Sequence, residues 1–154
     1  MRVSLKYMLD TNIFNRLIDN CLPDDFLTSR IFVATHIQRD ELAMTKSDER
    51  RIALMAAFHE IVQEQVPTSS AVFDVSNWDE SCWTSESSKY DEMLNRLKVL
   101  DTLSKKKPKN PEMNRARDVL IAETAILNNC SLLTADHNLS KLCLEFGGSS
   151  ELID

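Results

Sequence analysis

LKYMLDTN, residues 5–12, is the stretch of the sequence that decides the fold. Its first five residues form a short apolar run, interrupted by Lys6, and predict a strand over residues 5–9. Asp10 and Thr11 follow this strand directly, and both residue types are common where helices begin, so a helix is expected over residues 11–19. A strand that leads at once into a helix is typical of sheets covered by helices.

Strand and helix patterns alternate along the rest of the chain. Further strands are predicted at residues 31–34, 71–75, 131–134 and 151–153. Further helices are predicted from residue 36 to a break near Ser47, and at residues 48–65, 90–103, 113–128 and 139–145. This alternation predicts one α/β domain with three layers, α/β/α, around a mostly parallel sheet of four to five strands.

Length and composition indicate a single compact domain. The chain has 154 residues, of which 43% are hydrophobic and 27% charged, close to the averages of globular proteins. The apolar run near the N-terminus is too short for a signal peptide or a membrane span, so a cytoplasmic protein is expected. The four cysteines show no CxxC spacing and the three histidines stand apart, which argues against a disulfide framework and a zinc site.

The charge of the chain is unevenly distributed. The net charge is −6, but residues 96–117 hold eight basic and two acidic residues, a local charge of +6 that leaves −12 for the remainder. An acidic body with one basic segment suits a protein that binds cations in a group of carboxylates and contacts phosphates beside them. A solvated lysine-rich loop explains the basic segment equally well.

Two acids directly follow predicted strands. Asp10 closes the first strand, and Asp136 follows the strand at residues 131–134. In parallel sheets, ligands bind beyond the carboxyl ends of the strands, which makes both acids candidates for chemistry. Each also has an ordinary structural explanation, because Asp is a favoured N-cap of helices.

Two further acids lie on helix faces that should be apolar. Glu41 follows Ile37 by four residues, and Asp118 begins a stripe of small apolar residues at positions 122, 125 and 126. An acid on a buried face needs a partner, and the two candidates for Asp118 are a salt bridge with Arg115 and a bound cation. Mg²⁺ and Mn²⁺ prefer oxygen ligands and would neutralise several carboxylates together.

Together these motifs resemble the PIN domain, and most of all the toxin component of VapBC toxin-antitoxin pairs. The resemblance runs the full length of the chain and is carried by DTN at residues 10–12, the helical Glu41, DVLIAETA at residues 118–125 and LTADHN at residues 133–138. It implies a catalytic, metal-binding cluster of four acids, namely Asp10, Glu41, Asp118 and Asp136. It also implies supporting polar residues at the cofactor, namely Thr11, Asn12, Thr134 and Asn138, the last at a position where many relatives carry another acid.

The resemblance implies a metal-dependent endoribonuclease that hydrolyses RNA phosphodiester bonds with one or two Mg²⁺ or Mn²⁺ ions per site. It further implies a toxin-antitoxin system, with an antitoxin protein and a second copy of the chain as partners, and no membrane association. The stretch between Glu41 and Asp118 is longer than in the short toxins of the family. Residues 76–111 are the expected extra material, an insertion or a lid.

Two other functions fit parts of the sequence. A catalytically weak or silent PIN-like binding module would keep the same motif residues. A receiver-type phosphoacceptor domain would use Asp74 as its acceptor, but it needs an acidic pair where Thr11 and Asn12 follow Asp10. P-loop and dinucleotide-binding enzymes are disfavoured, since the chain has only two glycines and neither GxGxxG nor GxxxxGK.

Overall fold

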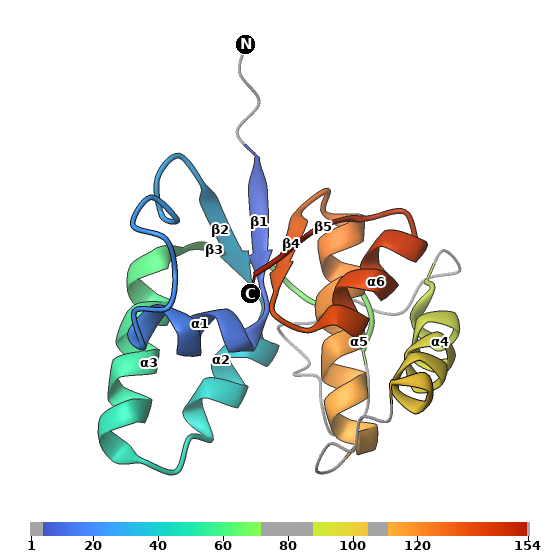
Figure 1. The fold of residues 1–154 in the computed structure, drawn as a ribbon, viewed down its shortest axis with the longest axis horizontal. Helices are drawn as coiled ribbons and strands as arrows, with labels where there is room; N and C mark the ends of the chain where they lie inside the picture. Colours follow the sequence, from blue (N-terminus) through green and yellow to red (C-terminus); the bar gives the residue numbers. More distant parts are fainter. Residues whose placement is uncertain (1–4, 72–87, 105–110, 154) are drawn as a thin grey trace.

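The computed structural model describes residues 5–71, 88–104 and 111–153 (Figure 1). Within these ranges the strands are β1 (Lys6–Leu9), β2 (Ile31–Ala34), β3 (Val62–Gln65), β4 (Ser131–Thr134) and β5 (Ser149–Leu152). The helices are α1 (Thr11–Ile18), α2 (His36–Ala43), α3 (Asp48–Ile61), α4 (Tyr90–Leu103), α5 (Pro111–Leu127) and α6 (His137–Glu145). The strands form one sheet in the order β3-β2-β1-β4-β5, and every pair of neighbours is parallel.

Helices cover both sides of this sheet, with α1 and α3 on one side and α4, α5 and α6 on the other (Figure 1). Successive residues of the central strands point into different cores, because side chains alternate along a strand. Met8 and Leu132 pack in the core formed with α4, α5 and α6, whereas Leu9 and Leu133 pack in the core formed with α1 and α3. The predicted three-layer fold with a parallel sheet is therefore confirmed.

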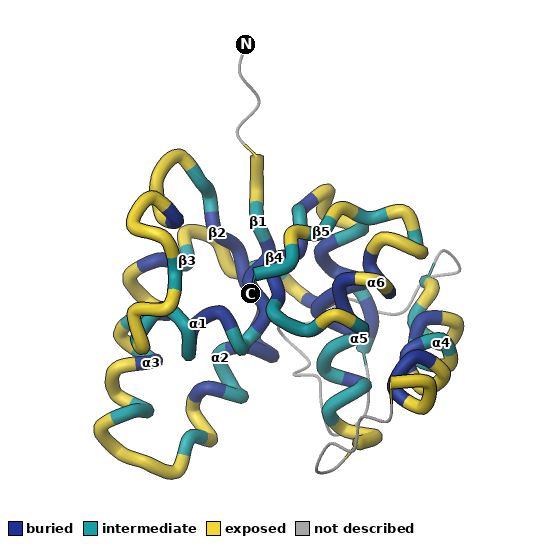
Figure 2. The backbone as a smooth tube through the Cα atoms, in the orientation of Figure 1, coloured by how far each residue is buried: buried dark blue, intermediate teal, exposed yellow. Residues whose placement is uncertain are grey.

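The central strand β1 leads the chain into the covered middle of the sheet. Exposure falls along β1, from an exposed start at Lys6 to a fully buried end at Leu9 (Figure 2). Leu9 lies opposite Leu133 in β4. The carboxyl ends of β1 and β4 therefore meet at the same edge of the sheet, and the residues that follow them are neighbours in space.

The third strand differs from the prediction. The helix expected over residues 48–65 ends at Ile61, and Val62–Gln65 forms β3 beside β2. β3 lies at the edge of the sheet and most of its side chains are exposed, so its sequence shows no apolar alternation that would mark a strand. The strand expected at residues 71–75 lies outside the described residues except for Ala71, which is not in a strand.

The ends of three other elements also differ slightly from the prediction. α5 begins at Pro111, a residue favoured in the first turn of a helix, and α6 begins at His137 directly after its N-cap, Asp136. Both starts come two residues before the predicted ones. β5 begins at Ser149 instead of residue 151, because its pairing with β4 includes two polar serines.

Part of the segment expected as an insertion or lid belongs to the core. Residues 90–103 form α4 as predicted, and Met93, Leu97 and Leu100 are buried against the sheet and its helices. Residues 76–87 and 105–110 of the same segment lie outside the described residues. The insertion or lid therefore stays a prediction.

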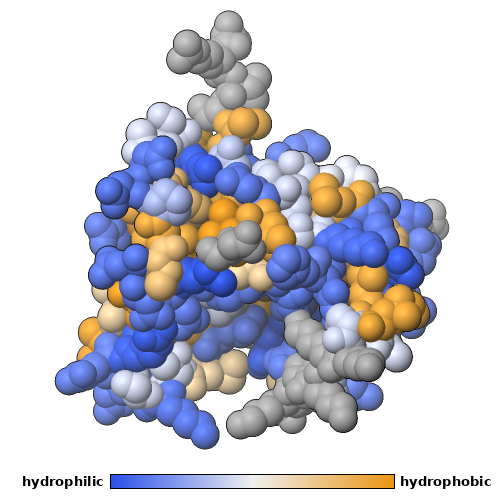
Figure 3. All heavy atoms as spheres, viewed as in Figure 1, coloured by the Kyte–Doolittle hydropathy of each residue, from blue (hydrophilic) through white to orange (hydrophobic). Residues whose placement is uncertain are grey.

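The surface combines polar regions with separate apolar areas. Hydrophilic residues cover most of the face shown in Figure 3, and apolar areas lie between them. The most exposed apolar side chains of the described residues include Leu103 on α4 and Ile52 on α3. In the described parts of the chain, no helix has both the length and the apolar character needed to cross a membrane.

The cysteines of the described residues are free. Cys21 is exposed, whereas Cys130 and Cys143 are buried. Burial raises the pKa of the Cys143 thiol to about 11, so this side chain stays protonated and apolar in the core.

Candidate active site

Asp10 is the acid at the centre of the candidate site. Its backbone N–H donates to the Leu133 carbonyl at 2.9 Å, and the residue is only 5% exposed. Its carboxylate accepts hydrogen bonds from the Thr11 backbone N–H (2.8 Å), the Asn12 amide (3.0 Å) and the Thr134 hydroxyl (2.7 Å). Asp10 is therefore the N-cap of α1, and hydrogen bonds on both oxygens fix the orientation of its carboxylate.

Thr134 joins Asp10 to Asp136. Its hydroxyl donates to Asp10 and accepts from the backbone N–H of Asp136 at 3.0 Å. Asp136 in turn caps α6, because its Oδ1 accepts from the backbone N–H of Asn138 at 2.9 Å. Two of the predicted acids therefore belong to one hydrogen-bond network, and both also perform the capping role that the sequence allows.

The predicted supporting residues Thr11 and Asn12 extend this network. The Oδ1 of Asn12 accepts from the backbone N–H of Ala135 at 3.2 Å, which links the start of α1 to the loop after β4. The Thr11 hydroxyl donates to Oε1 of Glu41 at 3.2 Å. Thr11 therefore binds two acids at once, Asp10 through its backbone and Glu41 through its side chain.

Glu41 is the acid with the most perturbed ionisation. The pKa of Glu41 is raised from its ordinary 4.5 to about 7, mainly by burial and secondly by the nearby negative charge of Asp10. The positive charge of Arg117 and the hydrogen bond from Thr11 act in the opposite direction. A carboxyl group with this pKa exchanges its proton near neutral pH, which is the property of an effective general base.

Gln38 ties the helix that carries Glu41 to the strand that carries Asp10. The side chain is fully buried, and its Nε2 donates to the Leu9 carbonyl at 2.8 Å. Its Oε1 accepts from the backbone N–H (2.9 Å) and the hydroxyl (2.6 Å) of Thr35, the N-cap of α2. Leu9 directly precedes Asp10, and Gln38 lies three residues before Glu41, so this amide fixes the two acids relative to each other.

Asp118 lies half-buried on α5. The sequence suggested Arg115 as a possible salt-bridge partner of Asp118. In the structure Arg115 forms a salt bridge with Asp101, in which its Nε donates a hydrogen bond of 2.9 Å. Arg117 directly precedes Asp118 and is close enough to Glu41 to lower its pKa. Arg117 therefore lies near Glu41, and the place of Asp118 in the site stays a prediction.

Asn138 turns its amide nitrogen toward α4. Nδ2 donates to Oδ1 of Asp101 and to the hydroxyl of Ser104, each at 2.9 Å. If Asn138 is a neutral ligand of the metal, as predicted, its carbonyl oxygen would be the ligand atom. This role stays a prediction.

The structure brings some of the predicted acids together more closely than others. Asp10 and Glu41 are joined through Thr11, and Asp136 is joined to Asp10 through Thr134. Over residues 5–71, 88–104 and 111–153, no group of three or more Asp, Glu, His or Cys side chains forms a ready-made metal site. Mg²⁺ often uses only one or two carboxylates and keeps several waters, so the all-oxygen donors of Asp10 and Glu41 fit such an ion.

Comparisons with known proteins concern the whole fold. No family model and no curated protein matches the sequence. Among solved structures, VapBC2 from Rickettsia felis, bound to a DNA fragment from its promoter, is 18% identical, with a TM-score of 0.53 over 97% of this chain and 100% of that chain. The DNA-bound VapBC of Salmonella typhimurium is 16% identical, with a TM-score of 0.50 over 96% and 97% of the two chains.

The chain shares the fold of these VapBC proteins. A domain of a functionally unknown protein from Methanocaldococcus jannaschii is similar to the same degree, with 16% identity and a TM-score of 0.50 over 97% of this chain and 91% of that chain. The predicted resemblance to the PIN-domain toxins of VapBC pairs is therefore confirmed at the level of the fold.

The sequence analysis did not single out two buried acids, Asp101 and Glu123. Asp101 lies on the buried face of α4, so the argument that selected Asp118 would also have selected it. Glu123 on α5 accepts hydrogen bonds from the hydroxyls of Ser70 (2.6 Å) and Ser88 (3.0 Å). These partners are 53 and 35 residues away in the sequence, so no local pattern predicts this arrangement.

Proposed function

We propose that this chain is a metal-dependent endoribonuclease that acts as the toxin of a toxin-antitoxin pair. The observation that carries the proposal is the pair of carboxylates, Asp10 and Glu41, held together by Thr11. They lie beyond the carboxyl ends of parallel strands, where ligands bind in α/β sheets. The fold shared with VapBC complexes supports the same assignment.

The chemistry of the site is suited to hydrolysis of a phosphodiester. One or two Mg²⁺ or Mn²⁺ ions would be held by the predicted acids Asp10, Glu41, Asp118 and Asp136. Such an ion, when bound, lowers the pKa of a water ligand and stabilises the charge that develops on the phosphate. Without an ion, burial and the Asp10 charge raise the pKa of Glu41 to about 7. A bound cation would favour its ionised form, in which the carboxylate would hold the ion or orient the attacking water. Thr11 and Thr134 orient the carboxylates of Glu41 and Asp10.

The proposed partners come from the likeness to toxin-antitoxin complexes. The two VapBC structures hold DNA, one of them from a promoter. We expect this chain to bind an antitoxin protein that covers the acidic site, to form a homodimer and to take RNA as its substrate. The long segment between Glu41 and Asp118 would then shape the path of the RNA.

A catalytically silent binding module is the second candidate. It is favoured by one observation: the Asp10 carboxylate is already occupied by three hydrogen bonds, and the described acids form no ready-made metal site. A receiver-type domain is disfavoured by the sheet, because receiver domains have the strand order 2-1-3-4-5 and this chain has the order 3-2-1-4-5.

The decisive experiment compares RNA cleavage by the parent protein and by Asp10→Asn, with Mg²⁺ or Mn²⁺ and with excess chelator. We expect cleavage only with the metal, and a loss of more than about 100-fold in Asp10→Asn, since even indirect supports of a metal site contribute about 10–100-fold. Asp91→Asn, which changes an exposed acid on α4, is the matched control and should cleave like the parent.

Circular dichroism melting of all three proteins should show folded chains. Full cleavage in excess chelator would rule out the metal-dependent mechanism. A folded parent protein that cleaves no RNA with either metal would favour the silent binding module.

A further inference from the structure

We infer that Asp101 is a positioning residue for the acidic site: its carboxylate joins α5, the helix that carries Asp118, to α6, the helix that Asp136 caps. This inference rests on the proposed function, because it assigns a role in binding the metal. It concerns a residue on α4, which supplies none of the four predicted acids.

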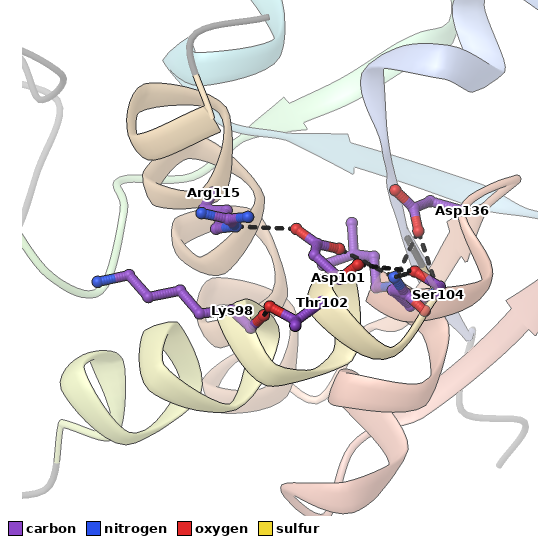
Figure 4. A network of polar contacts seen from close by, with 8 residues as sticks. Lys98, Asp101, Thr102, Ser104, Arg115 and Asp136 are labelled. Carbon is purple, nitrogen blue, oxygen red and sulfur yellow. Dashed lines mark hydrogen bonds and ion pairs between the residues drawn. The ribbon is translucent and has the colours of Figure 1, made fainter. Parts of the chain in front are cut away.

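Asp101 is buried and bridges two helices. It is 2% exposed, and its two carboxylate oxygens have different partners (Figure 4). Oδ2 accepts from Nε of Arg115 on α5 at 2.9 Å, and Oδ1 accepts from Nδ2 of Asn138 on α6 at 2.9 Å. The carboxylate therefore fixes the distance between α5 and α6 as well as the position of α4.

Each partner of Asp101 is close in sequence to a predicted metal ligand. Arg115 lies three residues before Asp118, which is about one turn of the same helix. Asn138 donates its backbone N–H to the carboxylate of Asp136 at 2.9 Å. A shift of Asp101 would therefore disturb the support of Asp136 and the turn of α5 that precedes Asp118.

Ser104 completes the arrangement at the end of α4. Its hydroxyl accepts from the same Nδ2 of Asn138 at 2.9 Å and donates to the backbone carbonyl of Asp101 at 3.2 Å. Asn138 is therefore held by two neighbouring groups of α4, and its side chain has little freedom to rotate.

Packing alone does not explain a buried ion pair at this position. Met93, Leu97 and Leu100 already attach α4 to the core. Burying Asp101 and Arg115 requires both charges to lose water, and apolar side chains of similar size often stabilise a protein at least as well. The hydrogen bonds of the ion pair add a geometric constraint, because they fix how the helices are rotated and positioned relative to one another.

A second ion pair between α4 and α6 provides a matched control. Arg96 binds Glu145 through two hydrogen bonds of 2.8 and 2.9 Å. Both side chains are about one third exposed, and Glu145 is the last residue of α6, whereas Asp136 precedes its first residue. Glu145→Gln therefore weakens the contact between the same two helices at the end far from the site.

The experiment measures Mn²⁺ binding without RNA, by electron paramagnetic resonance of the free ion. We expect Asp101→Asn to weaken Mn²⁺ binding by about 10–100-fold, the usual effect of losing a group that orients a metal ligand. Glu145→Gln should stay within about twofold of the parent protein. RNA cleavage by Asp101→Asn should recover when the Mn²⁺ concentration is raised, which loss of folded protein would not allow.

Asp101→Asn leaves the half-buried Arg115 charge without its partner and is expected to lower the melting temperature. The double variant Asp101→Asn/Arg115→Gln removes both charges, so it leaves no unpaired charge. Mn²⁺ binding can be measured on it if the single variant unfolds. Its Mn²⁺ binding should also be about 10-fold weaker or more.

The outcomes separate this inference from the proposed function. If the parent binds Mn²⁺ and the folded Asp101 variants bind it within about twofold, the positioning role is wrong and the proposed function stands. If the parent itself binds no Mn²⁺ and cleaves no RNA with Mg²⁺ or Mn²⁺, both the positioning role and the proposed function are wrong.

Discussion

The Thr134 hydroxyl donates a 2.7 Å hydrogen bond to the carboxylate of Asp10, 124 residues earlier in the sequence. The contact exists because β1 and β4 are parallel neighbours, so the residues at their carboxyl ends come together. The same hydroxyl accepts the backbone N–H of Asp136 at 3.0 Å. One buried hydroxyl therefore contacts two of the four acids that we propose as metal ligands.

Thr134→Val tests this relationship, because valine has nearly the same shape and lacks the hydroxyl. We expect the free energy of unfolding to fall by about 1–3 kcal/mol, since the Asp136 N–H loses its partner in a buried place. RNA cleavage should fall by about 10–100-fold in the folded protein. Thr134→Ser keeps the hydroxyl and should retain most of the activity. Equal cleavage by Thr134→Val and the parent would contradict a role in orienting Asp10.

The raised pKa of Glu41 predicts a specific dependence of the free energy of unfolding on pH. Its pKa is about 7 in the folded protein and 4.5 ordinarily, so between these values the folded state holds more protons than the unfolded state. Stability contributed by protonated Glu41 is therefore fully present below about pH 4.5 and is lost as the pH rises through about 7. The loss amounts to at most about 3 kcal/mol.

Glu41→Gln should remove this dependence, because glutamine does not titrate. Chemical denaturation at several pH values should show the variant to be as stable as the parent near about pH 4.5 and more stable than the parent near about pH 8. Added Mn²⁺ should stabilise the parent at the higher pH and have a weaker effect on the variant. If the two stability curves run parallel between these pH values, the pKa of Glu41 is not raised.

Replacing the buried amide of Gln38 is expected to cause a large loss of stability. Gln38→Met keeps the size of the side chain but removes its hydrogen bonds to the Leu9 carbonyl and to Thr35. Each buried group left without a partner costs about 1–3 kcal/mol, so we expect a total loss on the order of 3 kcal/mol in urea denaturation. Gln63→Met on the exposed edge strand β3 is the control and should change stability by less than about 0.5 kcal/mol. Similar losses in both variants would contradict the assigned role of Gln38.

Burial decides how much of this fold can be predicted from the sequence. β1, β2 and β4 end in fully buried residues and appear as apolar runs, so their positions follow from the residues alone. β3 and β5 are edge strands whose side chains are mostly polar and exposed or half-buried. Their pairing with β2 and β4 is a tertiary effect that local periodicity does not show.

The candidate site follows the same division. Asp10 and Asp136 can be predicted because each follows a buried strand, and Glu41 and Asp118 because an acid interrupts an apolar helix face. The contacts between them could not be predicted, because they depend on the order of strands in the sheet. The bond of Asp101 to Asn138 spans 37 residues and depends on how α4 packs against α6.

The lysine run Lys105, Lys106, Lys107 and Lys109 gives the last prediction, which rests on the sequence because these residues lie outside the described part of the chain. Two other cations of the basic segment are already used, since Arg96 binds Glu145 and Arg115 binds Asp101. Of the other cations of the segment, these four lysines are the largest group, beside Lys98 and Arg117. Each phosphate that they neutralise adds a slope of about −0.7 to the dependence of log affinity on log salt concentration.

Replacing all four lysines with alanine should therefore weaken RNA binding and reduce the magnitude of the salt slope by up to about three units. Single-turnover cleavage at saturating RNA should stay nearly unchanged, because the loss of contacts that contribute only to affinity does not alter the chemical step. The comparison is best made with Asp10→Asn as the background, so that the RNA remains intact during the titration. An unchanged affinity and slope would identify the run as a solvated loop and direct the search for the RNA path to Arg16, Arg39 and the pair Arg50 and Arg51.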